Sequence, residues 1–388
     1  MLMLVFHPKA PRRESLPIGF AGVLTASGFV LPRGKDPRSD FTTGGLMTKS
    51  QTQIAFVIDL NKCIGCHTCT VACKMLWTND KGMDHMWWMK VNTMPGRGYP
   101  KDWEKMGGGY NGDGKVKLGK RPDEADYGKP MEFNYQEVFY GGQGNKVHLA
   151  PKEKPQWGPN WDEDIASGEY PNAYFFYMPR MCNHCGHPAC ADACPHDAIA
   201  KRDQDGVVLM IDDSKCESCA DPVCMQGCPY KEIYFNPARK VAQKCNACLP
   251  RTEREVAPAC VRQCPGRCIW VGLLDDTQGP VHKLVEEWKV ALPLHAEFGT
   301  KPHVYYVPPL APPRLDGDGN VDLSEPRLPT DYLRSLFGPE VDGALQRLQQ
   351  EMEKRRNNQE SELMNILIAR RWQELLGPFP KDPSEVQA

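Results

Sequence analysis

Short apolar runs separated by polar loops recur along the chain and predict strands. The first runs from Ile54 to Ile58, and four more follow, from Tyr174 to Tyr177, Val207 to Ile211, Ile233 to Phe235 and Ile269 to Leu273. Runs of this length, bounded by turn residues, are typical of strands. The last four each lie beside a group of cysteines, so residues 174–285 predict a repeated strand–loop–helix–strand unit.

The C-terminal part, residues 286–388, has a different pattern. Seven prolines between residues 302 and 330 predict an extended arm. Apolar residues at helical spacing then predict two amphipathic helices, the first carrying Val341, Leu345, Leu348 and Met352 and the second Leu363, Ile366, Leu367 and Leu375. We expect this arm to contact a partner subunit; the alternative is that its helices cover the protein's own core.

Two further segments stand apart from the predicted core, which comprises residues 47–73 and 174–285. Residues 74–173 are rich in glycine and aromatic residues and predict a loop-rich insertion. Residues 1–46 predict either a disordered or untranslated extension before Met47, or an export signal. The second reading depends on Arg12-Arg13, which precede the mildly apolar stretch from Leu16 to Leu31 and faintly resemble a twin-arginine signal.

Composition excludes several classes of protein. The net charge of −2 and the absence of a basic stripe argue against a nucleic-acid-binding protein. No apolar run is long enough to predict a membrane span. No phosphate-binding glycine loop or nucleophile–base pair is present, so we expect a chain that is not an enzyme by itself.

Sixteen of the seventeen cysteines fall into four runs, which predict iron–sulfur clusters. Each run begins C-x-x-C and carries two further cysteines; the runs are Cys63, Cys66, Cys69, Cys73; Cys182, Cys185, Cys190, Cys194; Cys216, Cys219, Cys224, Cys228; and Cys245, Cys248, Cys260, Cys264. In ferredoxin-type runs three thiolates hold one cluster and the fourth commonly serves the other cluster of a pair. Two C-x-x-C pairs also suit zinc, so a zinc-bound scaffold is an alternative, as is a stand-alone polyferredoxin.

Other residues near the runs suggest supporting roles. Lys62, Lys215 and Lys244 each precede the first cysteine of a run, and we hypothesise that their charge raises cluster potentials. The seventeenth cysteine, Cys268, is expected to be a buried, inert thiol. Three histidines lie inside cysteine loops and are expected to form hydrogen bonds or pack rather than bind iron: His67, His184 and His187.

With these runs placed, the chain resembles the iron–sulfur β subunits of the dimethyl-sulfoxide-reductase family of molybdenum enzymes. It is most similar to the group of ethylbenzene, steroid C25 and dimethylsulfide dehydrogenases and selenate, chlorate and perchlorate reductases. Segments that carry the resemblance include those from Asp59 to Cys66, Gly98 to Pro100, Pro179 to Cys185, Cys228 to Lys231 and Val290 to His295. The resemblance implies an α+β fold with two bacterial-ferredoxin-like modules and four cluster motifs.

The resemblance also implies how the thiols combine. The ligand sets are Cys63, Cys66, Cys69 and Cys264 for cluster 1; Cys245, Cys248, Cys260 and Cys73 for cluster 2; Cys182, Cys185, Cys190 and Cys228 for cluster 3; and Cys216, Cys219, Cys224 and Cys194 for cluster 4. Cluster 1 would face a molybdopterin-containing catalytic α subunit, and cluster 4 a haem-bearing γ subunit or cytochrome. Many relatives lack a cysteine at the position of Cys219 and hold a [3Fe–4S] cluster, so cluster 4 is either [4Fe–4S] or [3Fe–4S].

The substrate of the complex is predicted only by a local likeness. The stretches 114–122 and 135–142 look closest to the hydrocarbon-hydroxylating members, which favours a hydrocarbon or steroid dehydrogenase. The alternative is an oxyanion reductase for selenate, chlorate, perchlorate or nitrate, in which electrons flow in the opposite direction. The resemblance further implies a periplasmic protein of anaerobic respiration, exported together with its partner.

Overall fold

The largest sheet is built around β1 (Ile54–Asp59), the first strand that the sequence predicts. β1 pairs in parallel with β10 (Val304–Val307) and antiparallel with β8 (Ile269–Leu273), and β9 (Leu292–Pro293) completes the order β8-β1-β10-β9. The structure, a computed structural model, describes residues 52–128, 166–217, 219 and 221–386. All six residues of β1 are buried, because the strand is paired on both edges and covered on both faces.

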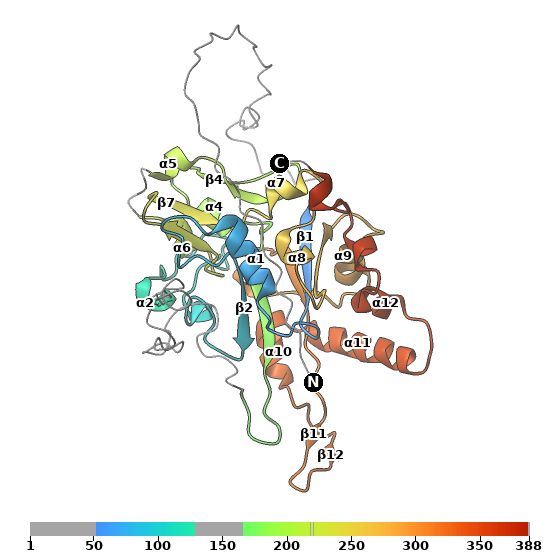
Figure 1. The fold of residues 1–388 in the computed structure, drawn as a ribbon. Helices are drawn as coiled ribbons and strands as arrows, with labels where there is room; N and C mark the ends of the chain where they lie inside the picture. The colour runs from blue at the N-terminus through green and yellow to red at the C-terminus, as the bar shows by residue number, and fades with distance from the viewer. Residues whose placement is uncertain (1–51, 129–165, 218, 220, 387–388) are drawn as a thin grey trace, which may run out of the picture. The chain divides into compact units, whose positions relative to one another are not determined.

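The two faces of β1 enter two different hydrophobic cores, since side chains alternate along a strand. Ile54, Phe56 and Ile58 pack in the larger core, which also holds most of the cysteines. Ala55 and Val57 pack in a smaller core with apolar residues of the C-terminal helices. The sheet therefore lies between the larger core, which holds most of the cysteines, and the smaller core, to which C-terminal residues contribute (Figure 1).

Four two-stranded ladders complete the β structure described. They are β2 (Met89–Met94) with β3 (Phe176–Met181), β4 (Ile199–Lys201) with β5 (Val208–Met210), β6 (Ile233–Asn236) with β7 (Val241–Lys244), and β11 (Arg314–Leu315) with β12 (Val321–Asp322). The β2–β3 pair runs without a break from Met89 opposite Met181 to Met94 opposite Phe176. This ladder fixes the insertion to the cysteine core.

The helices near the cysteines are short. They are α1 (Thr68–Trp77), α4 (Ala189–Asp192), α5 (Asp213–Glu217), α6 (Val223–Gly227), α7 (Leu249–Thr252) and α8 (Ala259–Arg262), and α2 (Glu124–Tyr127) lies in the insertion. α1 is the longest of them and begins after His67, whose backbone is left-handed with φ of 57°. Proline precedes α4, α6 and α8 directly, which suits an N-terminus where no N–H partner is needed.

The C-terminal helices cover the protein's own core, which is the alternative that the sequence left open. After α9 (Pro280–His282) and a π-helical turn at 283–287, the helices are α10 (Thr330–Phe337), α11 (Val341–Arg356) and α12 (Glu362–Ile368). Leu333 and Leu336 pack in the larger core, and Leu348, Leu363 and Leu367 in the smaller one. Figure 1 shows α9, α11 and α12 on the same side of β1. Contact with a partner through their outer surfaces stays a prediction.

The expected α+β mixture is present, with two qualifications of detail. The stretch 302–330 is extended at β10, but there it joins the central sheet and so is not a free arm. The division into two ferredoxin-like modules stays a prediction, while residues 1–46 and the segment 129–165 lie outside the described residues. Among the described residues no helix combines the length and the apolar character needed to cross a bilayer.

Candidate iron–sulfur centres

Two adjacent groups of thiols are organised by α1 and α8. Cys63 and Cys66 in the loop after β1, Cys69 in α1 and Cys264 after α8 line one cavity. The second cavity is lined by the next cysteine of α1, Cys73, with Cys245, Cys248 and Cys260. Cys69 and Cys73 are four residues apart, and so are Cys260 and Cys264. Cys69 and Cys73 therefore lie on one face of α1 and reach different cavities, and Cys260 in α8 and Cys264 just beyond it do the same.

A third cavity is lined by Cys194, Cys216, Cys219 and Cys224. Cys219 lines this cavity beside Cys216 and Cys224, although the two residues flanking it are not described. Its Sγ lies 3.0 Å from the carbonyl oxygen of Asp221 and donates to it.

The remaining four thiols of the runs are Cys182, Cys185, Cys190 and Cys228. Burial is the main cause that raises the pKa of Cys185, and the sulfurs of Cys182 and Cys228 raise it further. Burial likewise raises the pKa of Cys190, followed by the effect of Cys228 and then of Cys182 and Cys185. Three cavities thus bring together the cysteines that the resemblance assigns to clusters 1, 2 and 4, and the four ligand sets themselves stay a prediction.

The chemistry of these groups suits a cationic metal cluster. All seventeen cysteines are described, and each is a free thiol. Burial raises the pKa of Cys69 to about 12, with further contributions from Cys63 and Cys264, and it raises that of Cys73 well above the ordinary value. Several crowded thiols in an apolar pocket ionise together only when a cation compensates their charge, as iron does on binding thiolates.

Backbone and indole N–H groups point at the sulfurs. Ala242 N donates to Cys216 Sγ at 3.1 Å and Ala198 N to Cys194 Sγ at 3.4 Å. The indole Nε1 of Trp77 donates to Cys248 Sγ at 3.2 Å. Donors of this kind stabilise the thiolate form and tune the potential of a bound cluster.

The three lysines that were predicted to tune potentials differ in position. Lys244 is buried and donates to the carbonyl oxygen of Cys245 at 2.8 Å. Burial opposes its charge, but the sulfurs of Cys182, Cys190 and Cys245 outweigh this and raise the pKa of Lys244. Lys62 lines the first cavity and donates to the carbonyl oxygens of Arg267 and Leu367, both at 2.8 Å. Lys215, by contrast, is exposed.

We therefore predict that the effect of Lys244 exceeds that of Lys215. Lys244→Met is expected to lower the potentials of the two neighbouring centres by about 60 mV or more, a tenfold change in the ratio of reduced to oxidised cluster. Lys215→Gln, with an exposed and screened charge, is expected to shift potentials less. EPR-monitored redox titrations of both variants measure this, and equal midpoints in wild type and Lys244→Met would reject the tuning hypothesis.

The three histidines of the cysteine loops form hydrogen bonds or pack against rings, whereas Cys268 lies closer to the proposed ligands than the sequence predicts. His67 Nδ1 lies 3.3 Å from Thr70 Oγ1, and buried His184 accepts a hydrogen bond from Val208 N at 3.2 Å through Nδ1. His187 packs edge-on against the ring of Tyr110. Cys268 is buried as expected, but it also lines the first cavity, with its Sγ 3.4 Å from Cys264 Sγ. The sulfur–sulfur hydrogen bond is the main cause that lowers the pKa of Cys264 to about 6.

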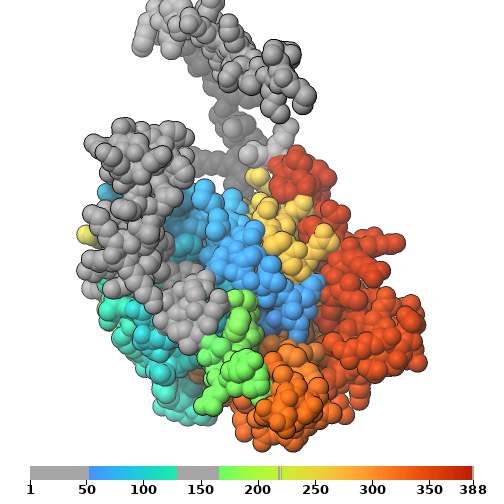
Figure 2. Space-filling view, turned by 60° about the horizontal axis from the view of Figure 1, so that its bottom comes forward, coloured from blue at the N-terminus to red at the C-terminus, as the bar shows by residue number. Residues whose placement is uncertain are grey.

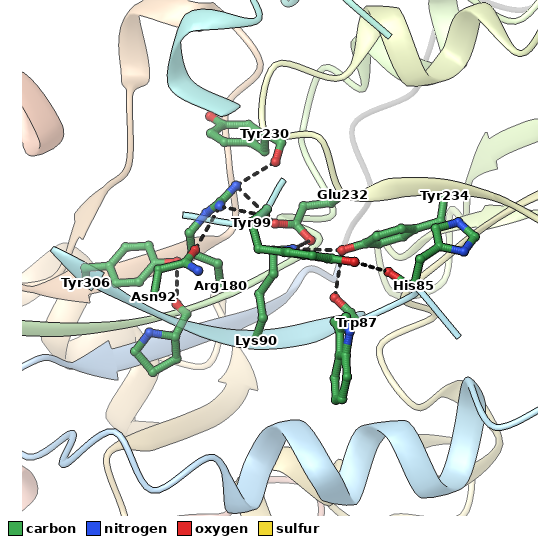
Figure 3. Close-up of polar contacts among 11 residues, drawn as sticks. His85, Trp87, Lys90, Asn92, Tyr99, Arg180, Tyr230, Glu232, Tyr234 and Tyr306 are labelled. Carbon is green, nitrogen blue, oxygen red and sulfur yellow. Dashed lines mark hydrogen bonds and ion pairs between the residues drawn. The ribbon is translucent and has the colours of Figure 1, made fainter. Parts of the chain in front are cut away.

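A buried charged network lies beside the Cys228 loop and was not predicted (Figure 3). The Lys90 ammonium of β2 forms an ion pair with Glu232, whose other oxygen lies 3.2 Å from Arg180 of β3. The Arg180 guanidinium also donates to Asn92 Oδ1 at 3.0 Å and to the carbonyl oxygen of Tyr230 at 2.6 Å. Two cations thus share one carboxylate at a site with almost no solvent contact. The network joins the β2–β3 ladder to the segment that follows Cys228.

Comparisons with known proteins agree with this arrangement. A family model described as "4Fe-4S dicluster domain" matches residues 173–274, and one described as "4Fe-4S binding domain" matches residues 55–75. Selenate reductase subunit beta of Thauera selenatis is 53% identical over 322 residues, covering 82% of this chain and 97% of the relative. Chlorate reductase subunit beta of Ideonella dechloratans is 53% identical over 323 residues, with coverage of 82% and 97%. Dimethylsulfide dehydrogenase subunit beta of Rhodovulum sulfidophilum is 50% identical over 323 residues, with coverage of 83% and 98%.

These relatives correct one expectation and establish another. The preference for a hydrocarbon or steroid dehydrogenase finds no support among them, and the oxyanion-reductase alternative fits better. The local likeness behind that preference involved two short loop-rich stretches, one of which, 135–142, lies outside the described residues. The matches extend over nearly the full length of each relative and come with iron–sulfur domains at the cysteine runs. On these grounds the chain belongs to the iron–sulfur β subunits of the dimethyl-sulfoxide-reductase family of molybdenum enzymes.

Proposed function

We propose that the chain carries four iron–sulfur clusters and relays electrons between a haem-bearing subunit and the molybdenum-containing catalytic subunit of an oxyanion reductase. The observation that carries the proposal is that three cavities are each lined by four of the sixteen thiols that the runs contain. An iron–sulfur cluster supplies reversible one-electron transfer when it is bound. The chain itself provides the thiolates, the N–H donors and the apolar surroundings that exclude water.

The proposed ligand sets follow the four groups. Cys63, Cys66, Cys69 and Cys264 would hold the first cluster, and Cys73, Cys245, Cys248 and Cys260 the second. Cys182, Cys185, Cys190 and Cys228 would hold the third, and Cys194, Cys216, Cys219 and Cys224 the fourth. The exchange of Cys69 and Cys73 along one helix keeps the first two sites adjacent, and short separation favours rapid electron transfer.

We propose four thiolates, and hence a [4Fe–4S] cluster, at the fourth site, because Cys219 lines the same cavity as Cys194, Cys216 and Cys224. The EPR spectrum of the oxidised wild-type protein is expected to lack a [3Fe–4S] signal. Cys219→Ala is expected to produce that signal, since one iron loses its thiolate. A [3Fe–4S] signal of full intensity in the wild type would show that Cys219 is not a ligand.

The direction of electron flow is proposed from the relatives. Two of those compared are subunits of reductases for selenate and chlorate, so we propose that electrons pass toward the catalytic subunit. The purified native complex is expected to oxidise reduced methyl viologen when selenate, chlorate, perchlorate or nitrate is added. A complex that instead oxidises dimethylsulfide or a hydrocarbon, and reduces none of these oxyanions, would reverse the proposed direction of electron flow.

Dimethylsulfide oxidation is the second candidate function, because the third relative is a subunit of a dimethylsulfide dehydrogenase.

We propose that the surface around α1 docks the catalytic subunit. Four apolar side chains there are exposed: Ile64, which lines the first cavity, by 67%, Val71 by 55%, Met75 by 64% and Leu76 by 49%. Figure 2 shows the segment that carries them, in blue, on the surface of the described part of the chain. An exposed apolar cluster of this kind marks an interaction site, and it lies where an electron would enter or leave the first centre. The haem-bearing subunit would then adjoin the fourth site.

Introducing charge on this surface is expected to weaken the complex. Met75→Glu would place a carboxylate in a desolvated interface, at a cost of about 2 kcal/mol or more, and should release catalytic subunit in co-purification. Leu118→Glu, at a similarly exposed apolar position in the insertion, is the matched control and should retain it. Normal recovery of the catalytic subunit with Met75→Glu would place the interface elsewhere.

Export of the assembled complex to the periplasm is likewise proposed, and cell fractionation tests it.

A further inference from the structure

The first cavity holds a fifth sulfur that the proposed ligand set does not use. Cys268 lines this cavity together with Cys63, Cys66, Cys69 and Cys264, and only 3% of its surface is exposed. Its Sγ lies 3.4 Å from Cys264 Sγ, within hydrogen-bonding distance for sulfur. The thiol therefore contacts one of the four proposed ligands directly and lines the same cavity as the other three.

The sheet holds this thiol in place. The Cys268 N–H donates to Cys264 Sγ at 3.4 Å, and its carbonyl oxygen accepts from Asp59 N at 2.8 Å. The next residue, Ile269, begins β8 and pairs with Ile58 of β1. Cys268 is thus anchored between a ligand loop and the central sheet, and its position does not depend on a mobile side chain.

A thiol in this position can donate a hydrogen bond to a ligand thiolate without binding iron itself. Each iron of a cubane takes one thiolate, and four thiolates are present without Cys268. A thiol is a weak hydrogen-bond donor, and a donor that faces a thiolate withdraws electron density from it. Reduction adds negative charge to the cluster and its ligands, so such a bond stabilises the reduced form more than the oxidised form.

We propose that Cys268 is a positioning residue of the first centre that remains outside the coordination sphere and donates its S–H hydrogen bond to Cys264. The bond raises the potential of this centre and leaves the other three unchanged. The inference rests on the proposed function, since it presupposes a cluster at this site.

The test compares four variants in the native complex by EPR-monitored redox titration and by iron content. Cys268→Ala and the size-matched Cys268→Val remove the donor, and Cys268→Ser keeps a hydroxyl donor. Val271→Ala shortens a buried side chain of β8 that does not line the first cavity. In the Ala and Val variants the ratio of reduced to oxidised first centre at a given potential should fall about tenfold, which is 59 mV for one electron. Cys268→Ser should recover most of this shift, and Val271→Ala should match the wild type, all with full iron content.

Three results would overturn the role of Cys268. An unchanged midpoint in both apolar variants would remove the donor function, and a Ser variant shifted as far as Ala would make the effect one of packing. Loss of about a quarter of the iron in the apolar variants would make Cys268 a ligand. A wild-type complex without iron would instead contradict the proposed function itself, so the two failures are distinguishable.

Discussion

Cys73→Ala is expected to remove about four iron atoms from each chain and to interrupt electron transfer through the complex. Cys73 is buried in α1 and lines the second cavity with Cys245, Cys248 and Cys260. Alanine supplies no thiolate, and no other cysteine lines this cavity. Iron analysis and the EPR spectrum of the reduced complex measure the loss, while viologen-linked turnover with an oxyanion should fall by at least about 100-fold.

A control in the same helix separates loss of a ligand from damage to α1. Thr78 caps the C-terminal end of α1, is buried, and its hydroxyl has no hydrogen-bond partner. Thr78→Val should therefore retain full iron content and activity. Full iron content in Cys73→Ala would show that Cys73 binds no cluster, and loss of all iron in both variants would mean that α1 had unfolded.

Glu232→Gln is expected to be the most destabilising change that leaves every cysteine in place. It removes the only negative charge between Lys90 and Arg180 within the network of Figure 3, where all three side chains have almost no solvent contact. Burial already lowers the pKa of Lys90 to about 8, and Glu232 is the main group that opposes this. Breaking a buried ion pair from one side costs about 3–5 kcal/mol, because a desolvated charge stays behind.

The urea midpoint of the purified subunit measures this loss, with two variants for comparison. Glu325→Gln breaks the Arg314–Glu325 pair, whose glutamate is largely exposed, and should cost less than about 1 kcal/mol. The double variant Lys90→Met/Glu232→Gln restores the net charge of the network and should recover part of the stability. If Glu232→Gln and Glu325→Gln shift the midpoint equally, the network contributes no more than a surface pair.

The sequence predicted the elements whose signal is local. The apolar runs at Ile54 to Ile58 and Ile269 to Leu273 are β1 and β8, and the spacing of Val341 and Leu348 predicts α11. β2 is not predicted, because Lys90 and Asn92 are buried there. Polar residues at these positions interrupt the apolar run that would indicate a buried strand. β10 was missed because it lies in a proline-rich stretch and is identified as a strand only by its pairing with β1.

The sequence predicts the kind of site, iron–sulfur ligation, but not how the four cysteine runs combine or which buried side chains surround them. Cysteine spacing indicates iron–sulfur ligation, yet which fourth cysteine joins which run depends on the packing of α1 against α8. The partners of Arg180 lie 88 residues away at Asn92 and 50 residues away at Tyr230, and no local pattern links them. The sequence predicts an inert thiol at Cys268, because a spacing of four residues from Cys264 does not show that both thiols line one cavity.

The iron content of anaerobically prepared protein shows whether four sets of four thiolates in this chain hold iron. Four [4Fe–4S] clusters require about sixteen iron atoms and as many sulfides per chain, and a brown colour that dithionite bleaches. A colourless protein that contains zinc, or one with fewer than about twelve iron atoms and no bleaching, would show that these thiols do not hold four iron–sulfur clusters.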